Sequence, residues 1–426
     1  MTDTARPDAS PTAAGTGSAA ASPSLRAPAP DTDVRAALFS DQEYASRLAK
    51  VRERMRFQGL QALIVTDPAN IFYLTGYDAW SFYTPQMLFV GPDGDPLLFM
   101  REMDANGAWR TACIDRELII GYPERYVHRP HIHPFDWVAF RLRQLGWVAR
   151  THGVVGLEMD SHFFSPKAYR ALVNAVPEWT LVESFELVNW VRAVKSDAEI
   201  QYMRHAARVA TGAMQAAVDA IEPGAPQNEI AAAIAHAQAL GAGESFGDYP
   251  AIMPLLPTGA SADTPHLTWS NRVLQDGEAV VVEIAGAHRR YHVPIARTIS
   301  LGEPGDDLKR LEEAVAEGLQ AVLDAAAPGV PVRELALAWN WKLAQYGLAK
   351  ESRLGYSIGI GYPPDWGERT MSIRSEDESI LERNMTFHII CGMWMEGHGY
   401  EVSESVRISD TGVEAFTAFP RRIIRK

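Results

Sequence analysis

Cysteine is scarce in this sequence: Cys113 and Cys391 are the only two among 426 residues. Two cysteines are too few for a disulfide framework, and neither stands in a Cys-x-x-Cys arrangement typical of zinc sites. The scarcity fits a reducing compartment, so we expect a cytoplasmic protein. No apolar run reaches 18 residues, which excludes a membrane-spanning helix.

Positive charge is also in short supply. The chain has 40 Lys and Arg against 53 Asp and Glu, which gives a formal net charge of −13. No long run of Lys or Arg occurs, which argues against a nucleic-acid partner or an anionic membrane surface. Hydrophobic residues make up 47% of the chain and charged residues 22%, as in ordinary globular proteins. The length suffices for two domains, each with its own core.

The first 36 residues almost entirely lack large apolar side chains. They consist mainly of Ala, Pro, Ser, Thr and Gly, a composition that cannot bury enough surface to offset the entropy of ordering the chain. The segment has no apolar run of the kind a signal peptide needs, and its four Asp residues argue against a transit peptide. Residues 1–36 are therefore predicted to be a disordered tail.

Residues 37–190 combine helical and strand patterns. The stretch 41–59 has apolar residues at helical spacing and ends at Gly59. "LQALIVTD" then reads as a buried strand, and "PQMLFVGPDGDPLLFM" reads as a hairpin that turns at Pro-Asp-Gly. These patterns predict a smaller α/β domain at the N-terminal end.

Residues 191–426 have a different pattern. Ser196 followed three residues later by Glu199 is a capping box that opens a long amphipathic helix. Further helices are expected near 227–240, 306–326 and 332–346, and strands at 279–285, 291–300, 384–396 and 400–409. Antiparallel strands interleaved with helices predict an α+β catalytic domain.

Several stretches of the second region match one family, and they occur in the order that the family has. They are "NWVRAVKSDAEIQYMRHAARVA", "HLTWSNRVLQDGEAVVVEIAG", "YSIGIGYPPDW", "MTFHIICGMW" and "YEVSESVRISDTG". The chain thereby resembles the creatinase/prolidase/methionine aminopeptidase, or pita-bread, family from about residue 40 to the C-terminus. The resemblance implies a pita-bread catalytic domain preceded by a smaller N-terminal domain.

The metal enzymes of that family bind their ions with Asp, Asp, His, Glu and Glu. Carried over position by position, those places are Glu283, Pro294, Tyr356, Ile390 and Ser403 here. Two hard cations need several converging carboxylate or imidazole ligands, which proline, isoleucine and tyrosine cannot supply. The resemblance therefore implies a metal-free member, as creatinase is, and we expect neither a metal nor a cofactor.

Three further stretches point to one branch of the family. "DPANIFYLTGYDAWSFY", "GDYPAIMPLLPTGASADTPHLTW" and "YPPDWGERTMSIR" resemble the branch that opens the cyclic amidine ring of ectoine to give N-acetyl-2,4-diaminobutyrate. This implies a small-molecule substrate, ectoine, and leaves hydroxyectoine open as a second one. It also implies a homodimer, and the product would suit a downstream deacetylase.

Glu283 and His266 are the main candidates for the chemistry. Glu283 ends the apolar run "AVVVE", so its carboxylate is expected to be partly buried with a raised pKa. It either attacks the amidinium carbon or holds the water that does. His266 stands, by the resemblance, where creatinase has its proton-shuttling histidine. The plainer alternatives are a salt bridge from Glu283 to Arg289, Arg290 or Arg297, and an ordinary surface position for His266.

Glu404 is a third catalytic candidate, although strand alternation puts its side chain opposite that of Ser403. An amidinium cation also binds well to aromatic faces, and a substrate carboxylate calls for an arginine or a hydroxyl group. The candidates for substrate binding are Trp80, Tyr83, Trp269, Tyr356, Trp366, Trp394, Arg369 and Arg374. Core packing of the aromatic side chains and surface pairing of the arginines are the alternatives.

The sequence thus predicts a metal-independent hydrolase of a cyclic amidine. One alternative is a metal-dependent prolidase-like peptidase, which the replaced ligands disfavour. Another is a non-catalytic protein that binds a small solute, which the retention of both Glu283 and His266 disfavours. A lyase acting on a sulfonium solute is the third, and it would be expected to keep the metal ligands.

Overall fold

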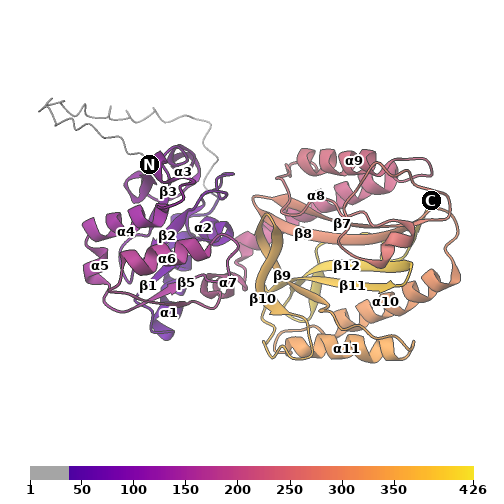
Figure 1. The fold of residues 1–426 in the computed structure, drawn as a ribbon. Coiled ribbons are helices and arrows are strands. Elements are labelled where there is room, and N and C mark those ends of the chain that lie inside the picture. Colours follow the sequence, from indigo (N-terminus) through magenta and orange to yellow (C-terminus); the bar gives the residue numbers. More distant parts are fainter. Residues whose placement is uncertain (1–37) are drawn as a thin grey trace, which may run out of the picture. The chain divides into compact units, whose positions relative to one another are not determined.

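The computed structural model describes residues 38–426, and the predicted tail lies outside them. Residues 62–183 contain a six-stranded sheet in the order β4-β3-β2-β1-β5-β6 (Figure 1). Its strands are β1 (Ala62–Val65), β2 (Met87–Val90), β3 (Leu97–Arg101), β4 (Ile119–Tyr122), β5 (Val154–Leu157) and β6 (Thr180–Glu183). The helices of this part are α1 (Asp41–Phe57), α2 (Pro68–Thr75), α3 (Ala105–Thr111), α4 (Pro134–Gln144), α5 (Trp147–Arg150), α6 (Pro166–Ala175) and α7 (Leu187–Arg192).

Local signals explain where these elements begin and end. Helix α1 starts after Ser40, whose Oγ accepts a hydrogen bond from the backbone N–H of Glu43 at 3.2 Å. It ends just before Gly59, whose φ of 71° suits a residue without Cβ. Strands β2 and β3 pair antiparallel, as the hairpin pattern predicts, while β1 pairs parallel with β5. Helices and a mixed sheet alternate here as predicted.

The remaining residues build an eight-stranded sheet, with β13-β12-β11-β9-β8-β14 in order, β10 beside β9 and β7 beside β8. Its strands are β7 (Ala279–His288), β8 (Tyr291–Ser300), β9 (Gly355–Tyr362), β10 (Asp365–Ser372), β11 (Thr386–Met395), β12 (His398–Ile408), β13 (Val413–Ala415) and β14 (Ile424–Arg425). The helices are α8 (Asp197–Ala220), α9 (Gln227–Leu240), α10 (Asp306–Ala325) and α11 (Val332–Ala344). The α+β prediction is confirmed.

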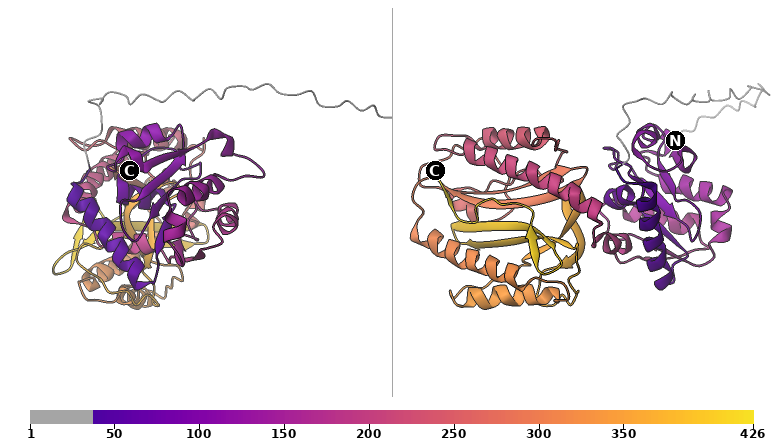
Figure 2. Two further views of the ribbon diagram at one scale, coloured as in Figure 1. Left: turned by 90° about the vertical axis from the view of Figure 1, so that its left-hand side faces the viewer. Right: turned by 180° about the vertical axis from the view of Figure 1, so that it is seen from behind.

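Helices cover these strands on two sides. Figures 1 and 2 show α8 beside β7 and β8 with α9 packed on α8, and α10 beside β11 and β12 with α11 packed on α10. Helix α8 begins with the predicted capping box, in which Ser196 accepts from the N–H of Glu199 and donates its own N–H back to that carboxylate at 2.8 Å. Strand β7 can lie close to α8 because Gly286 has no Cβ. A Cβ at this position would come within 2.2 Å of Ala206 O. The two long strands that carry Glu283 and its neighbours are therefore held against a rigid helix.

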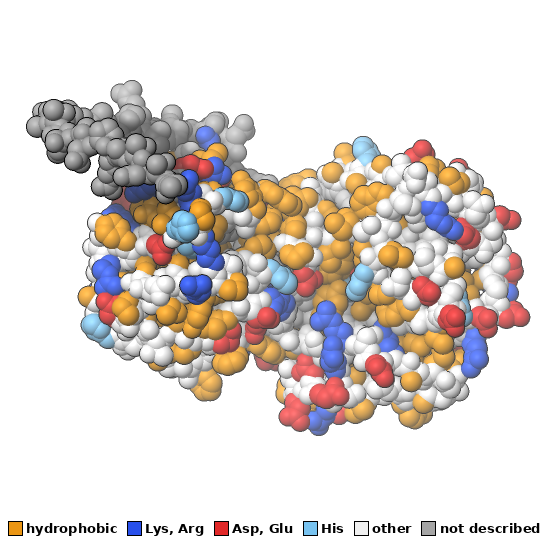
Figure 3. Space-filling view, viewed as in Figure 1, with side chains coloured by type: hydrophobic (Ala, Val, Ile, Leu, Met, Phe, Trp, Pro, Cys, Tyr) orange, Lys and Arg blue, Asp and Glu red, His pale blue; other side chains and the backbone are white. Residues whose placement is uncertain are grey.

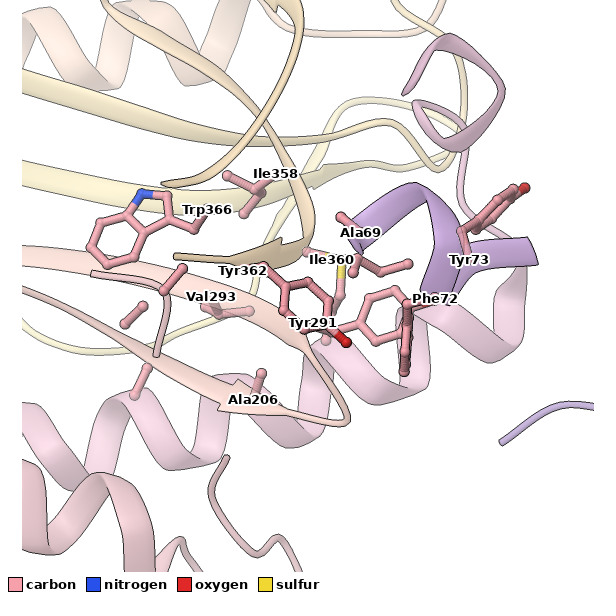
Figure 4. Close-up of a cluster of buried hydrophobic side chains, with 14 of the residues drawn as sticks. Ala69, Phe72, Tyr73, Ala206, Tyr291, Val293, Ile358, Ile360, Tyr362 and Trp366 are labelled. Atoms are coloured by element: carbon pink, nitrogen blue, oxygen red, sulfur yellow. The ribbon is translucent and has the colours of Figure 1, made fainter. Parts of the chain in front are cut away.

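The β9–β10 hairpin was not predicted as strands. Gly355 begins β9, Gly359 and Gly361 lie within it, and Pro363-Pro364 forms the turn, so the local strand signal is weak. Pairing with β8 and β11 overrides that weakness. Figure 4 shows the result: side chains of β9 and β10 join those of α8 and β8 in one apolar core.

The surface carries charges of both signs. On the face drawn in Figure 3, Lys and Arg side chains are interspersed with Asp and Glu, and apolar side chains lie between them. Within residues 38–426, none of the helices combines the length and the apolar character needed to cross a membrane.

Candidate active site

Glu283 lies in the middle of β7, where it pairs with Ala296 of β8. Its backbone N–H and C=O also bond to Leu255, at 3.1 and 3.0 Å, so it is held from both sides. The residue is only 3% exposed. Burial, and then the negative charges of Glu401 and Asp365, raise the pKa of Glu283 well above its ordinary value.

The three arginines considered as salt-bridge partners of Glu283 are engaged elsewhere. Arg289 lies over the ring of Phe246, with 4.9 Å between the guanidinium carbon and the ring centroid. Arg290 pairs with Asp248 at 3.9 Å, and Arg297 pairs with Glu404 at 2.7 Å. The carboxylate of Glu283 therefore forms no salt bridge with these three arginines.

Glu401 is the second carboxylate of the site. It precedes Ser403 by two residues on β12, so both side chains point to the same face. Glu401 is fully buried, and among residues 38–426 neither of its carboxylate oxygens finds a hydrogen-bond partner. Burial raises the pKa of Glu401 to about 7, against the opposing effect of the Lys350 ammonium. Two buried carboxylates that repel each other favour a shared proton or a bound cation.

A chain of hydrogen bonds lies beside this pair. The Nε1–H of Trp366 donates to Tyr356 Oη at 2.8 Å, and that hydroxyl is 3.1 Å from His388 Nδ1. His388 Nε2 is 2.7 Å from Ser403 Oγ, which also accepts the N–H of Ala296 at 2.7 Å. Burial, and then nearby arginines, lower the pKa of His388 to about 3, so its imidazole is neutral. Burial, and next the charge of Glu283, raise the pKa of Tyr356.

These contacts decide whether the family's two metal ions fit. Pro294 and Ile390 offer no ligating side-chain atom, and Tyr356 and Ser403 are engaged in the hydrogen-bond chain. The carbonyl of Pro294 accepts a hydrogen bond from Ser405 Oγ at 2.7 Å, which joins β8 to β12. In the part of the chain that the structure describes, no three His, Cys, Asp or Glu side chains are arranged to hold a metal ion. The side chains present do not fit a dinuclear metal centre.

His266 lies on the loop that follows residues 259–263, and its side chain is exposed. The neighbouring carbonyl of Leu267 accepts the N–H of Leu256 at 2.9 Å, and Leu255 in turn pairs with Glu283. The segment that contains Leu255 and Leu256 therefore lies between the backbone near His266 and the backbone of Glu283. Its role as a proton shuttle stays a prediction.

Glu404 lies on the other face of β12 from Glu401. Its carboxylate pairs with Arg297 at 2.7 Å and with Arg421 at 3.1 Å, and it lies 3.3 Å from Thr417 Oγ1. Alternation along the strand and these partners keep it away from the face that carries Glu401 and Ser403. This placement does not fit the predicted catalytic role, and Glu404 is instead the centre of a buried ion pair.

The predicted substrate-binding residues fall into three groups. Tyr356 and Trp366 meet in the interior, next to Glu283. Trp80 and Tyr83 are 57% and 60% exposed on the loop between α2 and β2, and Trp269 is also exposed. The remaining candidates are Arg369, which pairs with Asp160, Arg374, which is exposed, and Trp394, whose indole Nε1 is buried without a hydrogen-bond partner among the described residues.

Sequence reasoning gave no primary role to three residues of this site, Glu401, Asp365 and Lys350. A signal for Glu401 existed, because the two-residue period of a strand puts it on the same face as Ser403. Asp365 and Lys350 act electrostatically on Glu283 and Glu401 respectively. No local signal marks these two, because Asp365 begins β10 and Lys350 lies in the loop before β9, and only the fold brings them to the site.

Comparison with known families and proteins agrees with the fold. The model of the creatinase/prolidase N-terminal domain matches residues 47–194, and that of metallopeptidase family M24 matches residues 201–413. The chain is 44% identical over 395 residues to ectoine hydrolase of Halomonas elongata, which covers 91% of this chain and 98% of that protein. It is 41% identical over 390 residues to an uncharacterized hydrolase/peptidase of Sinorhizobium fredii, with 91% and 98% covered.

Solved structures share the fold at lower sequence identity. The X-Pro aminopeptidase of Thermotoga maritima superposes with a TM-score of 0.74 at 20% identity, over 89% of this chain and 99% of that one. The two matching models, the relatives above 40% identity and the pita-bread architecture agree with one another. The chain belongs to metallopeptidase family M24 and also carries a creatinase/prolidase N-terminal domain.

Proposed function

We propose that this enzyme hydrolyses the cyclic amidine ectoine to N-acetyl-2,4-diaminobutyrate without a metal ion. The observation that carries the proposal is the pair of buried carboxylates, Glu283 and Glu401, whose charges act on each other. An amidinium is a compact, planar cation that two carboxylates can hold through charge-assisted hydrogen bonds. The 44% identity to an ectoine hydrolase, over 98% of that protein's length, supports the same substrate.

The chemistry of the substrate explains how the reaction proceeds with carboxylates alone. The amidine carbon lies between two nitrogens and is electrophilic once the group is protonated. Glu283 either attacks this carbon or holds the water that attacks it. In both routes one water is added: its oxygen becomes the acetamide carbonyl, and one ring C–N bond breaks with transfer of a proton to the departing nitrogen.

Glu401 is the side chain that we propose for this proton transfer. A group with a pKa of about 7 can both accept and release a proton near neutral pH. Binding of the cation between Glu283 and Glu401 would lower the pKa of both carboxylates and release the proton that they share. His266 is the competing candidate, and variants of the two residues distinguish them.

The test is incubation of purified, chelator-treated protein with ectoine, with the products identified by NMR. We expect full turnover to N-acetyl-2,4-diaminobutyrate and well under one equivalent of bound metal. Xaa-Pro dipeptides serve as the comparison substrates and should remain intact. Activity that disappears on chelation and returns with Mn²⁺ or Zn²⁺ would overturn the metal-independent mechanism, and cleavage of the dipeptides would favour a peptidase.

We also propose the setting in which the enzyme works. Residues 37–190 and 191–426 are taken as its two domains, and two copies are taken to form a dimer in which the exposed Trp80 and Tyr83 reach the partner's site. Both cysteines are free thiols, which supports a cytoplasmic location. The acetylated product suits a downstream deacetylase. The oligomeric state is measurable by analytical ultracentrifugation.

A further inference from the structure

Lys350 belongs to none of the positions discussed above for substrate or catalysis. It lies in the loop between α11 and β9, and its ammonium donates a hydrogen bond to Ile390 O at 3.4 Å. The ammonium is 4.7 Å from the ring centroid of Trp394 and 6.0 Å from that of Trp339. One backbone carbonyl and two aromatic faces therefore fix a half-buried positive charge at the edge of β11.

The same part of β11 adjoins Glu401. Gly392 pairs with Glu401 across β11 and β12, as Ile390 pairs with Ser403. A Cβ at Gly392 would come within 2.6 Å of the Trp394 ring and 3.2 Å of Glu401 Cγ. The indole of Trp394 and the side chain of Glu401 therefore lie against the same glycine, with the Lys350 ammonium over the indole.

Ionisation of Glu401 depends strongly on a nearby positive charge. Within residues 38–426 both of its oxygens are buried without hydrogen-bond partners, an arrangement that strongly penalises the ionised form. The titratable neighbours of Glu401 are Glu283, which repels its charge, Cys391 and Lys350. Burial raises the pKa of the Cys391 thiol to about 12, so this thiol is neutral. Burial lowers the pKa of Lys350, while Cys391 and Glu401 act in the opposite direction, and Lys350 is the neighbour that attracts a negative charge on Glu401.

We propose that Lys350 is a positioning residue whose positive charge holds Glu401 in its ionised, reactive form next to Glu283. Lys350 does not contact the substrate in this arrangement and acts through Glu401. The consequence for the reaction rests on the proposed function, because Glu401 is the proton-transfer group only in that mechanism. The electrostatic pairing itself does not depend on which substrate the enzyme takes.

The test is a double-mutant cycle. Lys350→Met removes the charge and keeps the length of the side chain, Lys350→Arg keeps the charge, and Lys350→Met is also made in a Glu401→Gln protein. Lys342→Met is the matched control, since Lys342 likewise lies over a tryptophan, Trp341, and beside a glutamate at the surface. A true coupling appears as a loss in the wild-type background that vanishes when Glu401 is neutral.

Two readouts separate this proposal from the proposed function. In kcat/KM for ectoine, we expect Lys350→Met to lose about tenfold or more, the equivalent of one pH unit in the ionisation of Glu401, and Lys350→Arg to recover most of the loss. In the thermal midpoint, which needs no substrate, Lys350→Met should lose more at about pH 8.5 than at about pH 6, and only where Glu401 is present. Equal losses in both backgrounds, or equal losses at both pH values, would overturn the role of Lys350 even if ectoine is hydrolysed. If the thermal midpoints show the expected coupling between Lys350 and Glu401 but the protein does not hydrolyse ectoine, the proposed substrate is refuted and the role of Lys350 stands.

Discussion

Replacing Glu401 by glutamine should make the unliganded protein more stable at alkaline pH than the wild type. Glutamine keeps the shape of the side chain but cannot ionise. The folded protein raises the pKa of Glu401 from about 4.5 to about 7, so between these values it holds a proton that the unfolded chain releases. The stability that this proton contributes is complete below about pH 4.5 and is lost as the pH rises through 7. At about 1.4 kcal/mol per pH unit, the loss amounts to about 3 kcal/mol. The Glu401→Gln variant does not lose this stability, because its side chain does not titrate.

The assay is urea unfolding of both proteins at a series of pH values from about 4.5 to 8.5. The difference in the free energy of unfolding should grow with pH by about 3 kcal/mol in favour of Glu401→Gln. Loss of the Glu401 charge also relieves Glu283, whose pKa that charge raises, so the two effects have the same sign. Curves that stay parallel across the range would refute the raised pKa of the buried Glu401 and with it the proposed carboxylate pair.

Three further predictions concern single side chains. Glu283→Gln should lower turnover on the order of 10³-fold or more. A covalent adduct on residue 283 of the wild type, detected by peptide mass spectrometry, would distinguish a nucleophile from a base. Near-normal turnover in the variant would contradict both roles. His266→Ala should lose about 10²–10⁴-fold if it shuttles the proton, whereas an unchanged kcat would leave Glu401 as the acid/base group. Glu404→Gln should cost about 3–5 kcal/mol in urea unfolding because it leaves Arg297 buried without its partner, and a neutral effect would contradict the ion pair.

The local features of the fold could be predicted from the sequence. The capping box at Ser196 and Glu199, the glycine after α1 and the hairpin between β2 and β3 all depend on interactions within a few residues. The replacement of metal ligands by Pro294 and Ile390 could also be seen at once, because it concerns the chemistry of the side chains alone. These features depend on side-chain chemistry or on residues close together in the sequence, and the structure agrees with the predictions made for them.

The composition of the site was decided by tertiary structure. Glu401 and Glu404 are almost adjacent in sequence, yet one faces Glu283 and the other faces Arg297. Alternation separates the two side chains, but only the packing of β12 beside β8 decides which face meets the carboxylate of β7. Lys350 likewise reaches Glu401 through a loop whose path is set by β9 and β11. Such contacts join segments far apart in the chain, and their energy depends on burial and sheet order, which no short stretch of sequence encodes.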